Sequence, residues 1–212
     1  LPFWAMTTFY FWRSINHNMK KDWILFGVLS VFGFLSKYLF IYILFSFFIF
    51  IFFNLDKNKK LIKNYLLSII ISLLILLPHF IWLFENDFVT INYGLNRSNL
   101  TDTSLLDHFL NPANFLIKQT IILIPFFLMI VSILKKIRFK INLNEKKNFF
   151  IFSITLFPII LILTTSIITG AKIRTMWMTP FYLFFGIFFL ESLKKNLNIK
   201  KLQRFFITFF FF

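Results

Sequence analysis

Apolar runs separated by short basic segments make up most of the chain, and the longest run organises the rest. Residues 23–53 are almost unbroken apolar sequence with one lysine, Lys37, in the middle. A bilayer core takes about 20 helical residues. A run of about thirty therefore fits either one strongly tilted helix or two short helices that meet at Ser36-Lys37-Tyr38.

Basic residues on both sides of this run decide between the two options. Arg13, Lys20 and Lys21 precede it, and four lysines follow it between residues 54 and 64. Short loops rich in Lys and Arg stay in the cytoplasm, so both flanks lie on one side and an even number of crossings joins them. We predict two short helices, with Lys37 at their outer turn.

The same charge pattern predicts the topology of the remaining chain. Basic segments recur at 135–148 and 194–204, so 85–118 and 170–179 fall on the outer side by parity. The sequence thus predicts an all-α polytopic transmembrane helix bundle, a single domain with about six complete membrane helices. The expected helices cover residues 1–12, 23–35, 39–53, 65–84, 119–134, 149–169, 177–193 and 205–212, the first and last being partial, and the outer loop covers residues 85–118.

Composition supports a membrane protein over a soluble domain. The chain is 58% hydrophobic and 36 of its 212 residues are Phe. A net charge of +15 would suggest a nucleic-acid partner in a soluble protein. Here the basic residues gather in short segments between apolar runs, which is a topology signal, and we expect no nucleic-acid partner. The absence of cysteine excludes disulfides and thiolate metal sites.

The two ends of the sequence resemble cuts within a longer chain. It begins Leu-Pro-Phe-Trp without Met and stops in a run of Phe where a new apolar segment begins. We expect an internal fragment of a longer protein.

Five cations depart from the positive-inside pattern because they fall on the predicted outer face: Lys37, Arg97, Lys118, Lys172 and Arg174. Lys and Arg gathered at helix ends suit a lipid phosphate or pyrophosphate, since charge-assisted bonds offset the cost of desolvating both ions. The alternative is that these side chains reach the interface as anchors without any ligand.

Two carboxylates, Glu85 and Asp87, follow the predicted helix 65–84 directly. They suit a divalent cation or a sugar hydroxyl, although a solvated loop has the same composition. The three histidines show no metal-ligand spacing. The sequence contains no nucleophile constellation, Gly-rich phosphate loop or nucleotide-binding pattern, so nothing supports a soluble nucleotide donor.

Several stretches of the chain together carry a family resemblance: Asp22-Trp23 through Gly27, Gly33-Phe34-Leu35-Ser36-Lys37-Tyr38, Leu77-Pro78-His79-Phe80-Ile81-Trp82, Glu85-Asn86-Asp87-Phe88-Val89-Thr90 with Tyr93 and Arg97, and Thr169-Gly170-Ala171-Lys172-Ile173-Arg174-Thr175-Met176-Trp177. These stretches resemble bacterial glycosyltransferase family 39, relatives of the dolichyl-phosphate-mannose protein mannosyltransferases and of the lipid A aminoarabinose transferases. The resemblance covers most of residues 1–193.

The resemblance implies a fold and an activity. The fold is of the GT-C type, with an active cleft at the extracytoplasmic face of the bacterial inner membrane. The enzyme would move a sugar from a polyprenyl-phosphate donor to an unidentified lipid, glycan or protein acceptor. The catalytic carboxylate of the family lies in an earlier loop, so we expect this chain alone to be inactive.

The resemblance also implies roles for individual residues. Lys37, Arg97, Lys172 and Arg174 are expected to bind the donor lipid phosphate. Glu85, Asp87, Tyr38 and Trp177 are expected to contact the sugar or the acceptor. No residue is assigned to a metal, and no cofactor is expected except a divalent ion, which some members use.

Two other classes of membrane protein fit parts of the pattern. A transporter or lipid-linked oligosaccharide flippase would place ionisable residues at mid-membrane depth or show broken helices in matching halves, whereas these cations gather at one face. An O-antigen ligase or polymerase also acts on polyprenyl-linked sugars, with a different loop arrangement.

Overall fold

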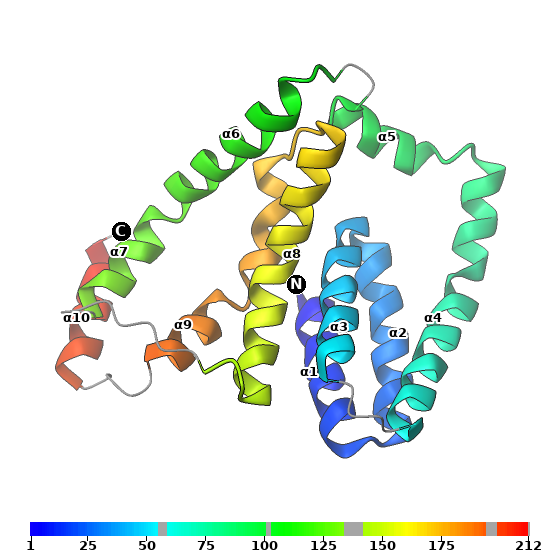
Figure 1. Cartoon of the computed structure of the whole chain (residues 1–212), viewed down its shortest axis with the longest axis horizontal. Helices are drawn as coiled ribbons and strands as arrows, with labels where there is room; N and C mark the ends of the chain where they lie inside the picture. The colour runs from blue at the N-terminus through cyan, green and yellow to red at the C-terminus, as the bar shows by residue number, and fades with distance from the viewer. Residues whose placement is uncertain (55–58, 101–102, 134–141, 194–198, 212) are drawn as a thin grey trace. The chain divides into compact units, whose positions relative to one another are not determined.

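A computed structural model describes residues 1–54, 59–100, 103–133, 142–193 and 199–211, and these residues fold mostly into helices (Figure 1). These residues contain no strand, which confirms the all-α fold class. The predicted inner loops rest partly on basic residues at positions 57, 135–140 and 194–195, which lie outside the described residues.

Several helices are suited to a bilayer by length and composition. Lys60–Glu85 and Lys146–Thr169 are each long and apolar enough to cross a membrane. Asp107–Ile122 and Ile124–Ser132 pass the same test together, with a bend of 51° between them, and Tyr38–Asn54 is a shorter apolar helix. The chain is therefore a helical integral membrane protein.

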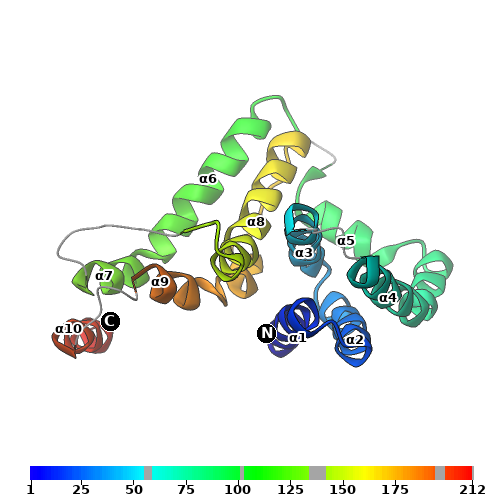
Figure 2. The same cartoon turned by 60° about the horizontal axis from the view of Figure 1, so that its bottom comes forward.

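The structure divides into two units, of which unit 1 is Leu1–Thr101. Within it, α2 packs against both α1 and α4, which Figure 2 shows nearly end-on. The elements of unit 1 are α1 (Pro2–His17), α2 (Lys20–Ser36), η1 (Tyr38–Phe40), α3 (Ile41–Asn54), α4 (Lys59–Glu85) and α5 (Val89–Arg97).

Aromatic packing holds α1, α2 and α3 together. The ring of Phe11 in α1 is fully buried and stacks on Phe47 of α3 with a centroid distance of 4.2 Å. It also meets Phe26 of α2 at 5.1 Å. Lipid tails are as apolar as these rings, so close van der Waals packing, more than removal from water, must stabilise this contact in a bilayer.

Gly27 brings α2 and α4 into close contact. A Cβ at this position would lie 2.7 Å from the carbonyl oxygen of Ser68, and the hydroxyl of Ser72 donates to the Gly27 carbonyl at 2.9 Å. Small residues at helix interfaces permit such backbone approach. The absence of a side chain at Gly27 therefore allows α2 and α4 to pack closely.

A polar junction joins α1, α2 and α4 at the end of unit 1 where α1 ends and α2 begins. Asn18 follows α1 with φ of 50°, in the left-handed region that Asn tolerates. Its side-chain oxygen accepts hydrogen bonds from Trp23 Nε1 at 3.0 Å and from Asn64 Nδ2 at 2.9 Å. One amide therefore joins the end of α1 to the first turns of α2 and α4.

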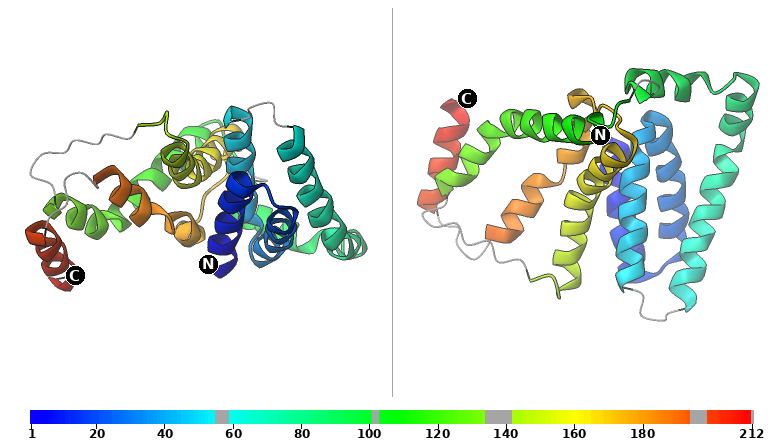
Figure 3. Two further views of the ribbon diagram at one scale, coloured as in Figure 1. Left: turned by 90° about the horizontal axis from the view of Figure 1, so that it is seen from below. Right: turned by 45° about the horizontal axis from the view of Figure 1, so that its top comes forward.

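Unit 2 is Asp102–Phe212, and its largest helix contact joins α7 to α10. The start of α6 also meets the end of α8, which the right panel of Figure 3 shows in green and gold. The elements of unit 2 are α6 (Asp107–Ile122), α7 (Ile124–Ile133), α8 (Lys146–Thr169), η3 (Thr175–Tyr182), α9 (Phe185–Leu193) and α10 (Ile199–Phe211).

Candidate functional site

The backbone leaves the helix at Lys37, where the two short predicted helices meet. α2 ends at Ser36, and Lys37 adopts an extended conformation with φ of −165° and ψ of 117°. Its N–H still bonds the carbonyls of Gly33 and Phe34, at 3.3 and 3.1 Å, so the last turn of α2 is closed. A cation at this position also interacts favourably with the negative end of the helix dipole.

The side chain of Lys37 is half-buried. Desolvation by the surrounding protein lowers the pKa of its ammonium below the ordinary value of 10.5. Because burial disfavours the charged form, an anionic group brought to this ammonium would recover part of that cost.

The next residue, Tyr38, joins three segments at this end of unit 1. Its hydroxyl lies 2.9 Å from Nε2 of His79 in α4 and 2.9 Å from the hydroxyl of Thr90 in α5. The ring of Trp82 stacks on His79 with a centroid distance of 5.9 Å and an angle of 16°. We call Tyr38, His79, Trp82 and Thr90 the Tyr38 cluster.

The chemistry of the Tyr38 cluster allows two proton arrangements. Where Nε2 of His79 is unprotonated, Tyr38 donates to it and accepts from Thr90. Where Nε2 carries the proton, Tyr38 accepts from it and donates to Thr90. The two tautomers of His79 therefore differ in the direction of both hydrogen bonds, and neither leaves Tyr38 without its partners.

The turn between α4 and α5 carries the two candidate carboxylates. Glu85 and Asp87 are both exposed to solvent. Asp87 and Phe88 have positive φ values of 49° and 53°, and Asn92 Nδ2 donates to the Asp87 carbonyl at 2.8 Å. This capping bond and the ring contact of Phe88 with Phe84 at 4.9 Å hold a turn that non-glycine residues adopt rarely. Both carboxylates therefore stand on a defined turn three to five residues before Thr90.

Arg97, at the end of α5, is exposed and contacts Tyr93 in the preceding turn. Its guanidinium donates to the Tyr93 hydroxyl at 2.6 Å and lies 5.6 Å from the ring centroid. The tyrosine orients the cation, and an exposed oriented guanidinium is suited to an anionic partner.

In unit 2, the turn after α8 is fixed by the start of α6. Gly170 has φ of 72°, and its carbonyl accepts a hydrogen bond from Asn111 Nδ2 at 2.8 Å. His108 Nδ1 donates to the carbonyl of Ile167 at 2.8 Å. We call residues 170–174 the Gly170 turn.

The remaining predicted site residues stand on or just after the Gly170 turn. Lys172 is exposed, while Arg174 and Trp177 are half-buried, and the Trp177 N–H bonds the Arg174 carbonyl at 3.0 Å. Lys172 also lies close enough to Asp107 to stabilise its negative charge. An anionic ligand at Lys172 would therefore compete with this carboxylate.

The structure brings some of the predicted residues together and assigns the others elsewhere. Tyr38, which directly follows Lys37, joins the α4–α5 segment through His79 and Thr90. Lys172, Arg174 and Trp177 belong to unit 2. Sequence reasoning assigned His79 no role, because histidine spacing alone gave no signal. The signal that could have found it was its place in the run 77–82, between Pro78 and the stacking partner Trp82.

No metal site is evident in the part of the chain that the structure describes. No group of three His, Cys, Asp or Glu side chains there could hold an ion.

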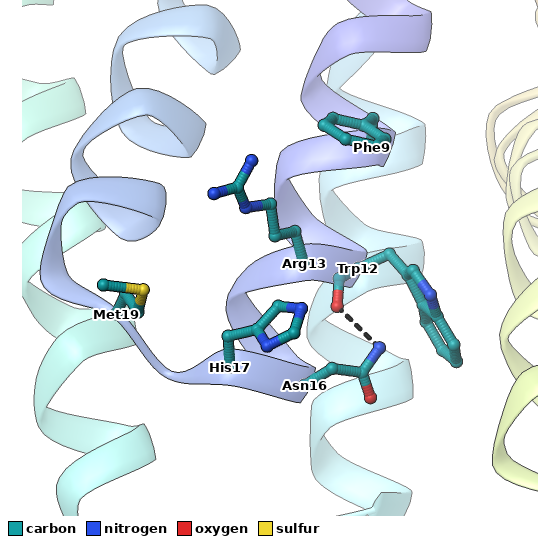
Figure 4. Close-up of a pocket in the computed structure, with 6 residues that line it drawn as sticks. All are labelled: Phe9, Trp12, Arg13, Asn16, His17 and Met19. Carbon is teal, nitrogen blue, oxygen red and sulfur yellow. Dashed lines mark hydrogen bonds between the residues drawn. The ribbon is translucent and has the colours of Figure 1, made fainter.

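A surface pocket of about 400 Å³ lies at the end of α1, on the side of unit 1 where Asn18 stands (Figure 4). Arg13, at its wall, bonds the buried carboxylate of Asp22 at 3.1 Å. Asn16 donates to the carbonyl of Trp12 at 3.0 Å. Because these polar groups have partners within the protein, the pocket gives no argument for a ligand.

Comparison with protein families gives one match. Residues 1–82 match the family model for dolichyl-phosphate-mannose-protein mannosyltransferase. No curated protein and no solved structure matches the chain. The matched segment includes Lys37, Tyr38 and His79, and it ends before Thr90. The first 82 residues are therefore similar to a glycosyltransferase family of the mannosyltransferase type.

Proposed function

We propose that this chain is part of a membrane glycosyltransferase that moves a sugar from a polyprenyl-phosphate donor to an extracytoplasmic lipid, glycan or protein. Lys37 is the central residue of the proposal. It lies within the family match, at an interrupted helix, as a half-buried cation beside the Tyr38 cluster. That placement is the observation that carries the proposal.

The reaction explains why a cation is needed at this position. A hydroxyl oxygen of the acceptor bonds to the anomeric carbon while the bond from that carbon to the donor phosphate oxygen breaks. The electron pair leaves on the phosphate, so negative charge grows there in the transition state. An ammonium beside that oxygen stabilises the transition state more than the ground state, which raises the rate.

The Tyr38 cluster would position groups around the leaving phosphate. Tyr38 links Lys37's turn to α4 and α5, so it limits movement of the backbone that carries the ammonium. Arg97, Lys172 and Arg174 are further candidate phosphate contacts, and Glu85, Asp87, Tyr38 and Trp177 are candidate sugar or acceptor contacts. The base that takes the acceptor proton is not assigned to any residue of this chain.

Charge distribution supports an active face on the extracytoplasmic side of the membrane. In unit 1, Asn18 and Asn64 meet at one end, next to basic residues 13–21 and 59–63. Tyr38, just past the end of α2, meets His79 in the last third of α4 at the other end. The positive-inside rule assigns the first end to the cytoplasm. Lys37 then faces the extracytoplasmic side.

Transfer assays on the full-length protein in proteoliposomes test this proposal. A radiolabelled sugar supplied on a polyprenyl phosphate should appear on an acceptor from the native membrane, and the same sugar supplied as a nucleotide sugar should not. Movement of the intact donor across the bilayer without sugar transfer would show a flippase instead, and would contradict the proposal.

A further inference from the structure

Besides the pocket at the end of α1, unit 1 has a hollow with lysines at its rim. This hollow lies at the end of unit 1 opposite to Lys37. It has a volume of about 630 Å³ and is formed by the first turn of α2 and the first turns of α4 (teal in Figure 1). Its polar rim consists of Lys20, Lys63 and Asn64, and its apolar wall includes Leu66, Leu67 and Ile70.

The polar junction described above sets the spacing of the two lysines. Asn18 lies two residues before Lys20, and Asn64 directly follows Lys63. Asn64 is only 3% exposed, and its side-chain amide donates to Asn18 at 2.9 Å. This buried bond holds the backbones that carry Lys20 and Lys63 next to each other, so two positive charges meet at one rim.

The charges of both lysines remain available to a ligand. Lys20 and Lys63 are exposed, and neither forms an ion pair with any residue that the structure describes. The neighbouring carboxylate, Asp22, is 1% exposed and already bonds Arg13 at 3.1 Å. Two like charges side by side are unfavourable unless an anion lies between them.

Below the lysines, α4 presents an apolar stripe. Lys63, Leu66, Leu67 and Ile70 follow the spacing i, i+3, i+4, i+7, which places them on one face of a helix. The stripe extends about 10 Å along α4, toward the hydrocarbon region. Leu66 and Ile70 are 51% and 54% exposed. A cationic rim above an exposed apolar stripe has the chemistry of a phospholipid site, with the headgroup at the lysines and an acyl chain on the stripe.

We propose that this hollow binds one anionic phospholipid of the leaflet at this end of unit 1. Free inorganic phosphate shares the headgroup chemistry but leaves the apolar stripe uncovered. Anionic lipids are concentrated in the cytoplasmic leaflet, where basic pockets between membrane helices bind their headgroups. The proposal concerns different residues from those that would bind the sugar donor and does not depend on them.

Native mass spectrometry of the full-length protein in detergent tests the site. The protein is titrated with phosphatidylglycerol or with phosphatidylcholine of the same acyl chains. Wild type should bind the first phosphatidylglycerol more tightly than the first phosphatidylcholine. Lys20→Gln with Lys63→Gln should weaken phosphatidylglycerol binding about tenfold or more, because each lysine near an anionic lipid contributes about fivefold.

Three further variants distinguish binding in the hollow from general attraction between an anionic lipid and a basic protein. Lys21→Gln with Lys200→Gln removes the same charge from exposed positions outside the hollow and should leave phosphatidylglycerol binding unchanged. Ile70→Trp should weaken binding by filling the apolar stripe while both lysines stay. Lys37→Met should have no effect on this lipid. Equal binding by wild type and the Lys20/Lys63 variant would overturn the proposal, as would displacement of the lipid by an equal concentration of soluble glycerol phosphate.

Discussion

The hydroxyl of Tyr38 lies 2.9 Å from Nε2 of His79, although 41 positions separate the two residues in the chain. The bond joins the residue after Lys37 to the last third of α4. Since Thr90 lies at the same distance from that hydroxyl, one phenol connects three segments. These two hydrogen bonds therefore fix the position of the turn at Lys37 within unit 1.

Tyr38→Phe tests the connection directly. Loss of the hydroxyl removes two hydrogen bonds while the ring keeps its packing, so we expect the free energy of unfolding to fall by about 1 kcal/mol. Combining it with His79→Leu should cost less than the sum of the two single changes, because both remove the same bond. Thermal unfolding of the purified full-length protein measures these changes.

Tyr10→Phe is the matched control. Its hydroxyl forms no hydrogen bond with the residues that the structure describes, so its removal should leave thermal unfolding unchanged. Equal effects of Tyr38→Phe and Tyr10→Phe would contradict the role given to the Tyr38 cluster.

Gly170→Ala tests the turn after α8. Glycine accepts φ of 72° without steric cost, whereas alanine does not. A Cβ there would also lie 3.0 Å from Thr103 Cβ and 3.1 Å from His108 Nε2. We expect a loss of about 1 to 2 kcal/mol in the free energy of unfolding.

Gly186→Ala provides the comparison within the same unit. A Cβ there meets nothing within 4 Å, and the residue lies in α9, so alanine should be neutral or slightly stabilising. Denaturation midpoints of the two variants measure the difference. A Gly170→Ala protein as stable as Gly186→Ala would show that the Gly170 turn has a different conformation.

Charge and length in the sequence predicted part of this structure. The positions of Lys37 between two short helices and of Gly27 at a close contact both follow from local rules on charge, helix length and residue size. The Tyr38–His79 hydrogen bond does not follow from such local rules. It depends on how α2 and α4 align along their lengths, and the periodicity of apolar residues does not specify that alignment. The positive φ values of Asp87 and Phe88 could not be predicted from the sequence either, because neither residue type signals positive φ as glycine does.

The polar composition of residues 85–118 predicted an outer segment but gave no bounds for the helices within it. The structure places α5 and the first part of α6 there. α6 continues through Pro112, which removes only one backbone hydrogen bond. The contacts of Asn111 and His108 with the end of α8 support this segment, and such contacts are tertiary information.

Single-cysteine labelling tests which end of unit 1 faces outward. The chain has no cysteine of its own, so Asn99→Cys and Lys21→Cys each give one target in it. Asn99→Cys should react with an impermeant maleimide added outside intact spheroplasts, and Lys21→Cys should react only after permeabilisation. The reverse result would contradict the assignment of residues 85–118 to the outside and 13–22 to the cytoplasm.

The pH dependence of transfer tests whether the Lys37 ammonium is the active form. Burial lowers the pKa of Lys37 below 10.5, so its charge is lost at a lower pH than that of an exposed lysine. The kcat/KM for the donor should therefore decline as the pH rises through this lowered pKa. Lys37→Arg should keep part of the activity and move the decline to higher pH, because guanidinium stays protonated. Lys118→Arg, at an exposed position, should leave the profile unchanged, and an identical profile for Lys37→Arg would exclude Lys37 as its cause.

Transfer by Lys37→Met in the full-length enzyme tests the central claim most directly. Methionine has nearly the length of lysine without its charge, so the protein should be expressed and should unfold at the same temperature or slightly higher. If Lys37 stabilises the charge on the leaving phosphate, the transfer rate in proteoliposomes should fall at least a hundredfold, about the loss seen when one such electrostatic contact is removed. A transfer rate equal to that of wild type would show that Lys37 is an interfacial anchor, and would contradict the account of the donor site.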